Sequence, residues 1–519
     1  MKLVTVATLL RVVFTINSVE SKSNFEPVPQ KYDKFVILPR YGILRGSTSR
    51  TTWTNRPIYQ FLGVRYAESP SGNLRFKAPV PVKPWKNIQD VREFGRKCPI
   101  LTDLAKMTEE ERRATDLEDC LNMAIYSPNL SGNLPVMVYV HGGSFYLTNA
   151  DEFPPNYLLE RNIVLVVVQY RLDALGFLST NSEDIPGNAA LMDVQQALTF
   201  VKENINRFGG NPNSVTLFGQ SAGAAMVSAL VISPAVPQNL FHRVIIQSGS
   251  VFSKWSVTTD PIKDARDIAE AAGLDSKESI NHLNEAFIKM DVFSLLQAVD
   301  RYQSNPQGGP LHLGARSLSI GGPNNLLPDL PQKIVSAPQY NKNYPMIIGT
   351  TKDDGSYVAT VNQVNLGAGD KCDAIRSIIS GTFWTEEEIA SNDIATIAPG
   401  LIDLLGTFLF KGPALQAAIS NAGFNRKNTF FYTFDHQGEK TRFGYEEDTS
   451  HYPFKGGVTH SDDLIYIFPY PWQVASLNQA DAQLANKLID LWTSFAANSS
   501  PQSVENGRKF SWPPMITGF

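Results

Sequence analysis

The sequence has little cysteine and histidine, no run of basic residues, and no long apolar run beyond its N-terminus. Its 46 basic and 50 acidic residues are interspersed, giving a net charge of −4. Without a Lys/Arg-rich segment, no nucleic acid or acidic membrane surface is expected as a partner. The apolar runs at 136–140 and 163–168 are far shorter than a membrane span and suit buried strands. Hydrophobic residues still make up 43% of the 519, which is enough for a large core.

The N-terminus reads MKLVTVATLLRVVFTINSVES. Lys2 precedes an apolar stretch that ends in small polar residues, a pattern typical of a secretory signal peptide, although Arg11 interrupts it. We therefore expect a signal over residues 1–21, with cleavage near 18–21, and a secreted protein. No other membrane span is expected.

The three cysteines are Cys98, Cys120 and Cys372. In an oxidising compartment Cys98 and Cys120 are the natural pair, and closing their loop would stabilise the fold by about 3 kcal/mol. Cys372 is then a free thiol. Two sequons, at Asn129 and Asn498, predict glycosylation if the chain is secreted.

Short β-branched runs alternate with helical patterns along the chain. Strands are expected at LPVMVYV, NIVLVVVQY, SVTLF, FHRVIIQSG, YPMIIGT and NTFFYTF, and helices at 192–209 and 262–274. This alternation predicts an α/β fold with a mostly parallel sheet covered on both faces. The Pro/Gly-rich segment 304–332 resembles a surface loop and not a linker, so residues 22–519 are predicted to form one domain.

Residues 217–226, LFGQSAGAAM, contain the pattern G-x-S-x-G around Ser221. The strand SVTLF precedes it and the buried-helix pattern AGAAMVSALVI follows, which is the strand–turn–helix context of a nucleophile elbow. Gly219 and Gly223 would let strand and helix cross closely. The pattern predicts a nucleophile at Ser221, and a tight packing turn is the alternative.

A serine nucleophile needs a base and an acid. Among seven histidines, His460 in the loop GGVTHSDD is favoured over His436 and His451 because a loop can carry the imidazole over the sheet edge. The strand MIIGTT ends before Asp353 and Asp354, and either acid could orient the imidazole. A surface histidine beside acids is the alternative for His460.

The oxyanion of an acyl-transfer reaction needs backbone N–H donors. The segment LPVMVYVHGGSF places Gly142, Gly143 and Ser144 directly after a strand, the position of the loop that completes such a hole. Glycine there lets the amides approach a substrate.

These features together resemble the carboxylesterase/cholinesterase family of α/β hydrolases, and particularly its insect secreted esterases. The resemblance covers nearly the whole chain through ordered blocks, among them EDCLNMAIYSP, VMVYVHGGSF, GNAALMDVQQAL, SVTLFGQSAG, FHRVIIQSGS, GTTKDDG and GVTHSDDLIYIF. It implies an α/β-hydrolase fold, carboxylic ester hydrolysis without a metal or organic cofactor, and a small-molecule ester as the partner. It indicates nothing about oligomeric state.

Residue by residue, the resemblance implies Ser221 as nucleophile, His460 as base and Asp354 as acid, where most members have Glu. It implies oxyanion donors at Gly143, Ser144 and Ala222, and a disulfide between Cys98 and Cys120. Ser248 would lie beside the triad. Two structural ion pairs are also implied: Arg75 with Glu118, and Arg171 with Asp193.

Several positions depart from the family pattern. Gln220 replaces the Glu that cholinesterases carry beside the serine, and the Cys98–Cys120 loop contains no tryptophan to stack on choline. Uncharged esters are therefore expected as substrates. Because GQSAG resembles juvenile hormone esterases, that activity is an alternative. A non-catalytic cholinesterase-like adhesion domain is a further alternative, although such domains usually lose the serine or histidine. Asp173 stands where Gly is usual, in a turn that Asp tolerates.

Overall fold

The computed structural model describes residues 33–304, 313–362, 394–443, 454–469, 477–505 and 507–515. The predicted signal peptide, His451 and Cys372 lie outside these residues.

The fold is built on an 11-stranded mixed sheet in the order β1-β2-β3-β5-β7-β6-β8-β9-β12-β13, with β4 beside β2. From β1 to β7 neighbouring strands along this order are antiparallel, and from β7 to β13 they are parallel. The strands are β1 Lys34–Leu38, β2 Gly42–Arg50, β3 Pro57–Arg65, β4 Gln89–Asp90, β5 Asn122–Ser127, β6 Leu134–Val140, β7 Val164–Val168, β8 Gly210–Gln220, β9 Arg243–Gln247, β12 Met346–Thr351 and β13 Thr429–Phe434.

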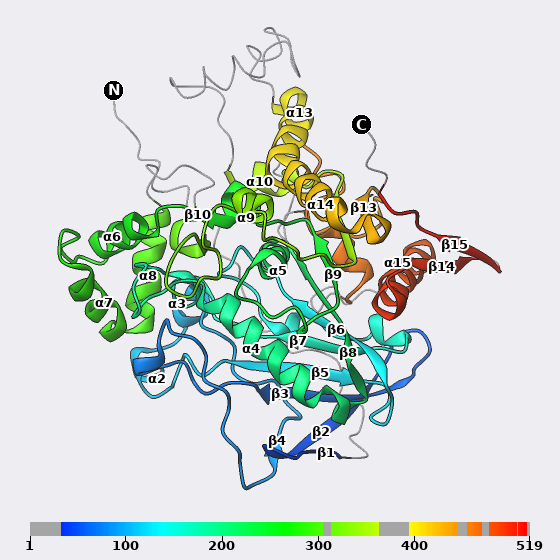
Figure 1. Cartoon of the computed structure of the whole chain (residues 1–519), viewed down its shortest axis with the longest axis horizontal. Helices are drawn as coiled ribbons and strands as arrows, with labels where there is room; N and C mark the ends of the chain where they lie inside the picture. The colour runs from blue at the N-terminus through cyan, green and yellow to red at the C-terminus, as the bar shows by residue number, and fades with distance from the viewer. Residues whose placement is uncertain are drawn as a thin grey trace.

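The parallel half of the sheet is buried on both faces, which is why its strands read as continuous apolar runs. In β6 the side chains of Val136, Val138 and Val140 join the core that contains α4 and α5. Met137 and Tyr139 point to the opposite face, where they join a second core with α15. Helices therefore cover both faces (Figure 1), as the alternating sequence pattern predicted.

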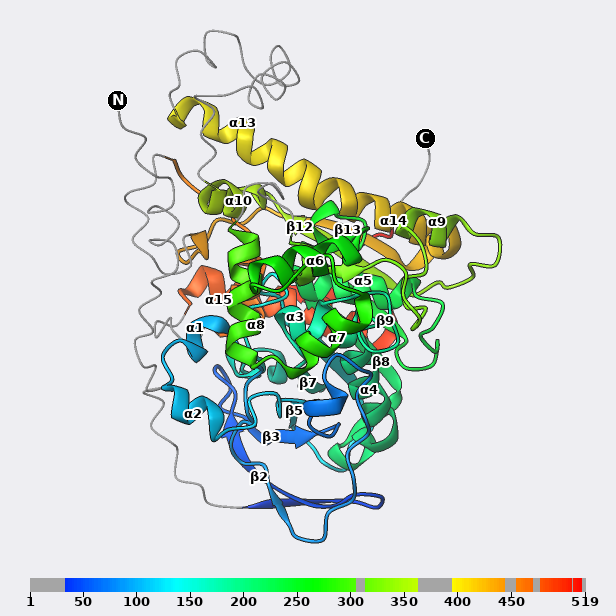
Figure 2. The same cartoon turned by 90° about the vertical axis from the view of Figure 1, so that its left-hand side faces the viewer.

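The helices are α1 Leu101–Leu104, α2 Glu109–Arg113, α3 Asp173–Phe177, α4 Ala189–Asn204, α5 Ala222–Ile232, α6 Pro261–Ala271, α7 Ile280–Lys289, α8 Val292–Gln303, α9 Pro331–Ser336, α10 Gly355–Asn362, α13 Ile394–Gly406, α14 Gly412–Asn425 and α15 Gln479–Asn498. Helices α6 to α8 form a third apolar cluster beside the sheet. Figure 2 shows α13 and α14 at the end of the molecule opposite β2.

The prediction of a surface loop over 304–332 is wrong for its central part. Residues 314–319 are buried, and β11 (Leu318–Ser319) pairs in parallel with β10 (Val257–Thr258). The side chain of Asn188 accepts from the backbone N–H of Ser319 and donates to its carbonyl, both at 2.8 Å. Because these backbone groups have partners, the segment can leave water despite its loop-like composition.

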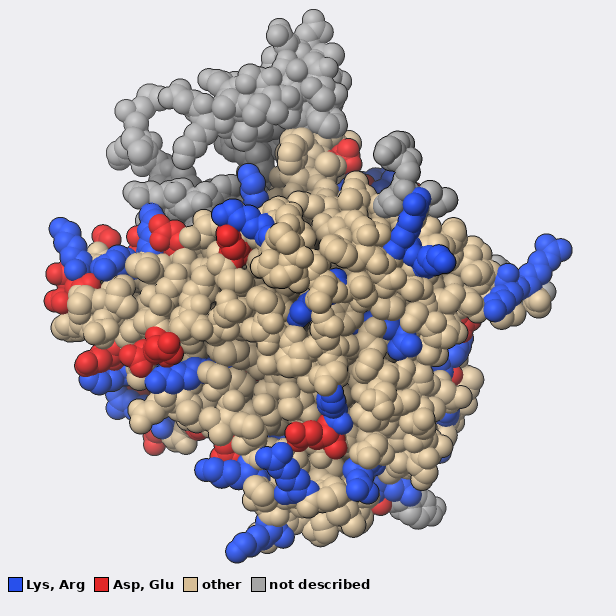
Figure 3. Space-filling view, viewed as in Figure 1, with Lys and Arg blue, Asp and Glu red and all other residues tan. Residues whose placement is uncertain are grey.

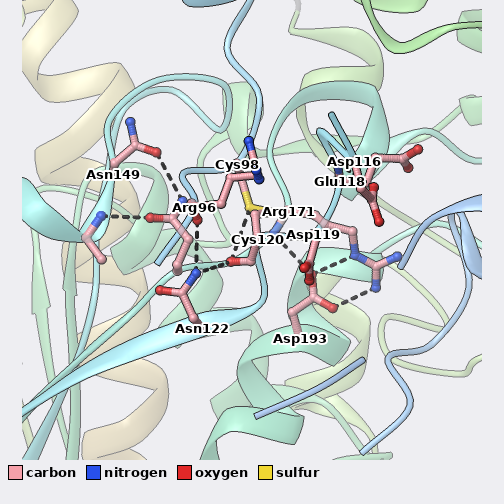
Figure 4. The surroundings of a disulfide bond; sticks show 12 residues. Arg96, Cys98, Asp116, Glu118, Asp119, Cys120, Asn122, Asn149, Arg171 and Asp193 are labelled. Carbon is pink, nitrogen blue, oxygen red and sulfur yellow. Dashed lines mark hydrogen bonds and ion pairs between the residues drawn. A yellow bond between two sulfur atoms is a disulfide. The ribbon is translucent and has the colours of Figure 1, made fainter. Parts of the chain in front are cut away.

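The expected disulfide between Cys98 and Cys120 is present, with the two Cα atoms 4.9 Å apart (Figure 4). The buried ion pair of Arg171 with Asp193 lies close to it in that view, with a shortest N–O distance of 2.6 Å. The other expected ion pair, Arg75 with Glu118, is also present and buried. The disulfide and the Arg75–Glu118 pair both lie between β3 and β5, and Arg171 joins this segment to the region after β7 through a hydrogen bond to the Lys77 carbonyl at 2.8 Å.

The surface carries both signs of charge without a large patch of either on the face drawn in Figure 3. Within the described residues, no helix combines the length and apolar character needed to cross a membrane.

Candidate active site

Ser221 stands at a sharp turn between strand β8 and helix α5, which begins at the very next residue. Its backbone is left-handed and strained, with φ 56° and ψ −124°, as a nucleophile elbow requires. A Cβ atom on Gly223 would lie 2.1 Å from the carbonyl oxygen of Val140, so only glycine fits where α5 crosses β6. Ser221 as a whole residue is 9% exposed and thus lies at the margin of the buried core.

His460 and Asp354 meet beside this turn. Nδ1 of His460 lies 2.8 Å from Oδ1 of Asp354, and both side chains are buried. The other carboxylate oxygen of Asp354 accepts from Ser248 Oγ at 2.9 Å and from the backbone N–H of Thr351 at 3.0 Å. Asp354 is therefore held by three donors, one of which is the imidazole.

Asp353, the other candidate acid, has a different place. Its Oδ2 accepts from the backbone N–H of Val458 at 2.8 Å, and its own N–H donates to the Val458 carbonyl at 3.0 Å. It thus fastens the histidine loop to the end of β12, while Asp354 contacts the imidazole itself.

The loop after β6 lies against the serine. A Cβ atom on Gly142 would come within 3.0 Å of the Cβ of Ser221. The next two residues have left-handed backbones, with φ 99° at Gly143 and φ 51° at Ser144. The buried, neutral ring of His141 supports this loop, since Nδ1 lies 2.9 Å from both Gly142 O and Thr148 Oγ1. Burial lowers the pKa of His141 to about 4.

The backbone N–H groups of Gly143, Ser144 and Ala222 donate to no acceptor among the described residues. Ala222 is also fully buried and is the first residue of α5, so its amide lies at the positive end of the helix dipole. Unpaired amides at such a place can bind an oxyanion.

Gln220 occupies the side of the imidazole where the serine would be expected. Its Nε2 lies 3.1 Å from His460 Nε2, and among the described residues no hydrogen bond joins His460 to Ser221 Oγ. Gln220 and Ser248 both touch the proposed triad: the former contacts the imidazole, and the latter contacts the carboxylate.

Two aromatic rings that the sequence did not point out also lie against His460. Phe410 lies at 4.8 Å and Tyr357 at 5.4 Å, measured between ring centroids. Phe410 belongs to a π-helical turn, Thr407–Lys411, in which the Leu409 carbonyl accepts from Ser253 Oγ and Trp255 Nε1. Such π-helical turns are frequent at functional sites. In the sequence, only the dipeptide Gly412-Pro413 indicates an irregularity in the helix at this point.

Asp463 is a second buried carboxyl near the imidazole. It accepts from Gln247 Nε2 at 2.8 Å and from Tyr432 OH at 2.9 Å. Burial raises its pKa, the charge of Asp354 raises it further, and His460 lowers it. Asp463 is fully buried and therefore packs within the protein interior.

Other predicted positions lie outside this centre. His436 contacts Asp481 of α15 at 2.8 Å and is partly exposed. Asn129 and Asn498, the two sequon residues, are exposed. Within the described residues, no group of three His, Cys, Asp or Glu side chains could hold a metal ion.

Comparison with known proteins identifies the family of the chain. The sequence model of the Carboxylesterase family matches residues 33–518. The chain is 30% identical to glutactin of Drosophila melanogaster, over 93% of this chain but only 48% of glutactin. It is 28% identical to the juvenile hormone esterase of Tribolium castaneum, over 91% of this chain and 84% of that esterase. It is 30% identical to liver carboxylesterase 1F of Rattus norvegicus, over 92% and 86% respectively. The chain thus belongs to the carboxylesterase family, a group of carboxylic ester hydrolases with the α/β-hydrolase fold.

Proposed function

We propose that the protein hydrolyses uncharged carboxylic esters through an acyl-enzyme on Ser221, with His460 as base and Asp354 as acid. The buried hydrogen bond between His460 Nδ1 and Asp354 Oδ1 carries the proposal. A carboxylate in that position fixes the tautomer that leaves Nε2 free to accept a proton, and it stabilises the imidazolium that forms.

The reaction has two steps of the same kind. Ser221 Oγ attacks the ester carbonyl carbon while His460 Nε2 takes its proton. The tetrahedral intermediate then collapses, and the alcohol leaves with that proton. Water next loses a proton to His460 and attacks the acyl-enzyme, and Ser221 leaves with the proton restored.

The negative oxygen of each intermediate would lie on the amides of Gly143, Ser144 and Ala222. Their lack of protein acceptors among the described residues supports this role. Loss of one such donor typically costs about 3–4 kcal/mol of transition-state stabilisation.

The preference for uncharged esters is supported by what surrounds His460. Gln220, which contacts the imidazole, is neutral and offers no charge to a cationic substrate. The buried carboxylate Asp354 is already held by three donors and is not available to a cationic substrate.

Labelling with a fluorophosphonate followed by peptide mapping tests the nucleophile. We expect the label on Ser221, and we expect Ser221→Ala to lose both labelling and hydrolysis of a short p-nitrophenyl ester. Ser228→Ala is the matched control, because Ser228 is a buried serine of α5, the helix that follows Ser221, and its Oγ accepts from Val251 N–H. Ester hydrolysis that persists in Ser221→Ala would contradict the proposal and leave the non-catalytic alternative open.

A juvenile-hormone-esterase-like activity is the second candidate. Gln220 in the GQSAG pattern favours it, and so does the similarity to the Tribolium castaneum enzyme of that name. A panel of esters that varies chain length on the acyl and alcohol sides, with juvenile hormone as one member, separates this activity from a general carboxylesterase. Preference for juvenile hormone over the simple esters would establish the narrower function.

We also propose that the protein is secreted, with residues 1–21 as its signal, and glycosylated at Asn129 and Asn498. The disulfide between Cys98 and Cys120 supports an oxidising compartment, and both asparagines are exposed. Expression in a secretory cell line tests this. We expect the protein in the medium, with a mass that falls on enzymatic deglycosylation and falls less in Asn129→Gln. Retention of the full-length chain in the cytosol would contradict the proposal.

A further inference from the structure

The side-chain amide of Gln220 lies in the centre of the site. Gln220 is the last residue of β8 and directly precedes Ser221, and its side chain is buried. Its Nε2 lies 3.1 Å from His460 Nε2 and 2.6 Å from Ser461 Oγ. Its Oε1 lies toward the loop after β6, 2.9 Å from where a Cβ of Gly142 would be.

The hydrogen-bond partners of His460 and Gln220 determine which of their nitrogens carry hydrogens. An ionised Asp354 can only accept, so the proton of a neutral His460 belongs on Nδ1 and its lone pair is on Nε2. The Gln220 amide nitrogen carries two hydrogens and has two acceptors within reach, His460 Nε2 and Ser461 Oγ. This orientation of the amide satisfies every one of these groups, whereas the flipped amide would place an oxygen against the Nε2 lone pair.

The same lone pair has to receive the proton of Ser221. Neutral imidazole has one acceptor site, so Gln220 and Ser221 compete for it. A donor to this site also stabilises the neutral ring over the charged ring and so lowers its affinity for a proton.

We propose that Gln220 is a positioning residue for the base: its amide donates to Nε2 of His460 in the resting site and yields Nε2 to Ser221 when an ester binds. This inference rests on the proposed function, because it assigns His460 as the base.

The other groups that face His460 are few. Asp354 bonds to Nδ1, Asp463 acts on the ring electrostatically from its own loop, and Tyr357 of α10 stacks on it. Phe410 and Ser461 carry no charge. Among the described residues, none of these groups except Asp354 is within hydrogen-bond range of a ring nitrogen of His460. Gln220 is therefore the side chain that forms a hydrogen bond with Nε2.

The pH dependence of fluorophosphonate labelling tests the role of Gln220, since labelling needs only the nucleophile and base and involves no ionising substrate. Gln220→Met removes both hydrogens at similar length. We expect the acidic limb of the rate–pH curve to shift upward by about 0.5–1 pH unit, the value of one neutral hydrogen bond. Gln220→Glu places a carboxylate beside Nε2 and is expected to shift the limb further upward.

Gln169→Met is the matched control. Gln169 is a glutamine as buried as Gln220, but its amide donates to Asn149 and not to the imidazole or to a carboxylate near it. We expect this variant to lose stability with the acidic limb unmoved, which separates an effect on the base from general damage to the core.

The outcomes are distinct. If the acidic limb of the rate–pH curve of Gln220→Met coincides with that of the wild type, the inference is overturned even though labelling of Ser221 stands. If Gln220→Met does not fold, as judged by thermal unfolding, Gln220→Leu, which also removes both amide hydrogens, takes its place in the same measurement. If the wild type is not labelled at Ser221 at any pH, the proposed function fails and this inference fails with it.

Discussion

Oδ1 of Asp354 lies 2.8 Å from Nδ1 of His460, and neither side chain is exposed to water by more than 2%. The pair bridges two loops that lie 106 residues apart in sequence, one after β12 and one before the short helix at Asp462–Tyr466. Ser248, at the end of β9, supports the carboxylate from a third loop. The alignment of the imidazole thus depends on the carboxyl ends of adjacent parallel strands, where open α/β sheets place their sites.

Replacement of Asp354 by Asn should abolish most of the activity without unfolding the protein. An amide can donate to Nδ1, which would move the ring proton to Nε2 and leave no lone pair for the proton of Ser221. We expect kcat to fall roughly 10³–10⁴-fold on the precedent of such acids in serine proteases. Steady-state hydrolysis of a p-nitrophenyl ester measures this, and circular dichroism checks the fold. Asp353→Asn is the comparison, since Asp353 bonds to Val458 and not to the imidazole, and near-equal losses in the two variants would contradict the assignment.

The parallel half of the fold was predictable because strands that are buried on both faces are continuous apolar runs in the sequence. The six predicted strands are all present, and α5 spans the predicted residues 222–232. The antiparallel strands β1 to β3 were not predicted. Exposed Phe35 and Ile37 and partly polar β2 give no continuous apolar run, because these strands lie at the sheet edge.

The site was predictable only in its local parts. The strand–turn–helix pattern around Ser221 indicated a nucleophile, and the glycines at 142–143 indicated the loop that would hold an oxyanion. The choice between Asp353 and Asp354 depended on which side chain points to His460, a property that spacing along one strand end does not encode. The amide of Gln220 and the ring of Phe410 contact the imidazole, and the buried carboxyl of Asp463 acts on it electrostatically, only because of tertiary packing.

Gly223→Ala should damage both stability and catalysis. The new Cβ would lie 2.1 Å from the Val140 carbonyl and 2.5 Å from that of His141, so α5 would have to move away from β6. Overpacking of this kind typically costs about 1–3 kcal/mol, and it displaces Ser221 at the helix N-terminus. Thermal unfolding and fluorophosphonate labelling measure the two effects.

The matched control for that substitution is Gly423→Ala in α14. A Cβ there meets no atom within 4 Å and replaces a helical glycine, so we expect the free energy of unfolding to rise by about 0.5–1 kcal/mol. Equal behaviour of the two variants would argue against close crossing of α5 and β6 as the reason for glycine at 223.

The double substitution Cys98→Ser and Cys120→Ser should lower the free energy of unfolding by about 3 kcal/mol. The disulfide closes a loop with a sequence separation of 22, and opening it restores conformational entropy to the unfolded chain. The bond lies at the antiparallel side of the fold, so labelling of Ser221 at low temperature should persist. Urea unfolding of both forms gives the difference, and unchanged stability would show that the bond constrains little.

His141 should make stability depend on pH between about 6.5 and 4. Its side chain is fully buried, and burial lowers its pKa to about 4 from the ordinary value near 6.5. Between these values the unfolded chain binds the proton and the native protein does not, so the contribution of His141 is complete above pH 6.5 and is lost as pH falls toward 4. The free energy of unfolding is expected to fall by up to about 3 kcal/mol through this group.

Comparison with His141→Gln isolates this contribution, because other buried groups act in the opposite sense over part of the same range. Burial raises the pKa of Glu152 and of Asp462 to about 7, so their contributions weaken as pH rises from about 4 to 7. We therefore expect the difference in unfolding free energy between wild type and His141→Gln, measured by urea at several pH values, to shrink as pH falls from 6.5 to 4.5. His282→Gln serves as the control, since the His282 side chain is 65% exposed and its removal should leave the wild-type pH dependence. A constant difference for His141→Gln across this range would mean that the ring beneath the Gly142 loop takes up a proton as readily in the folded protein as in water.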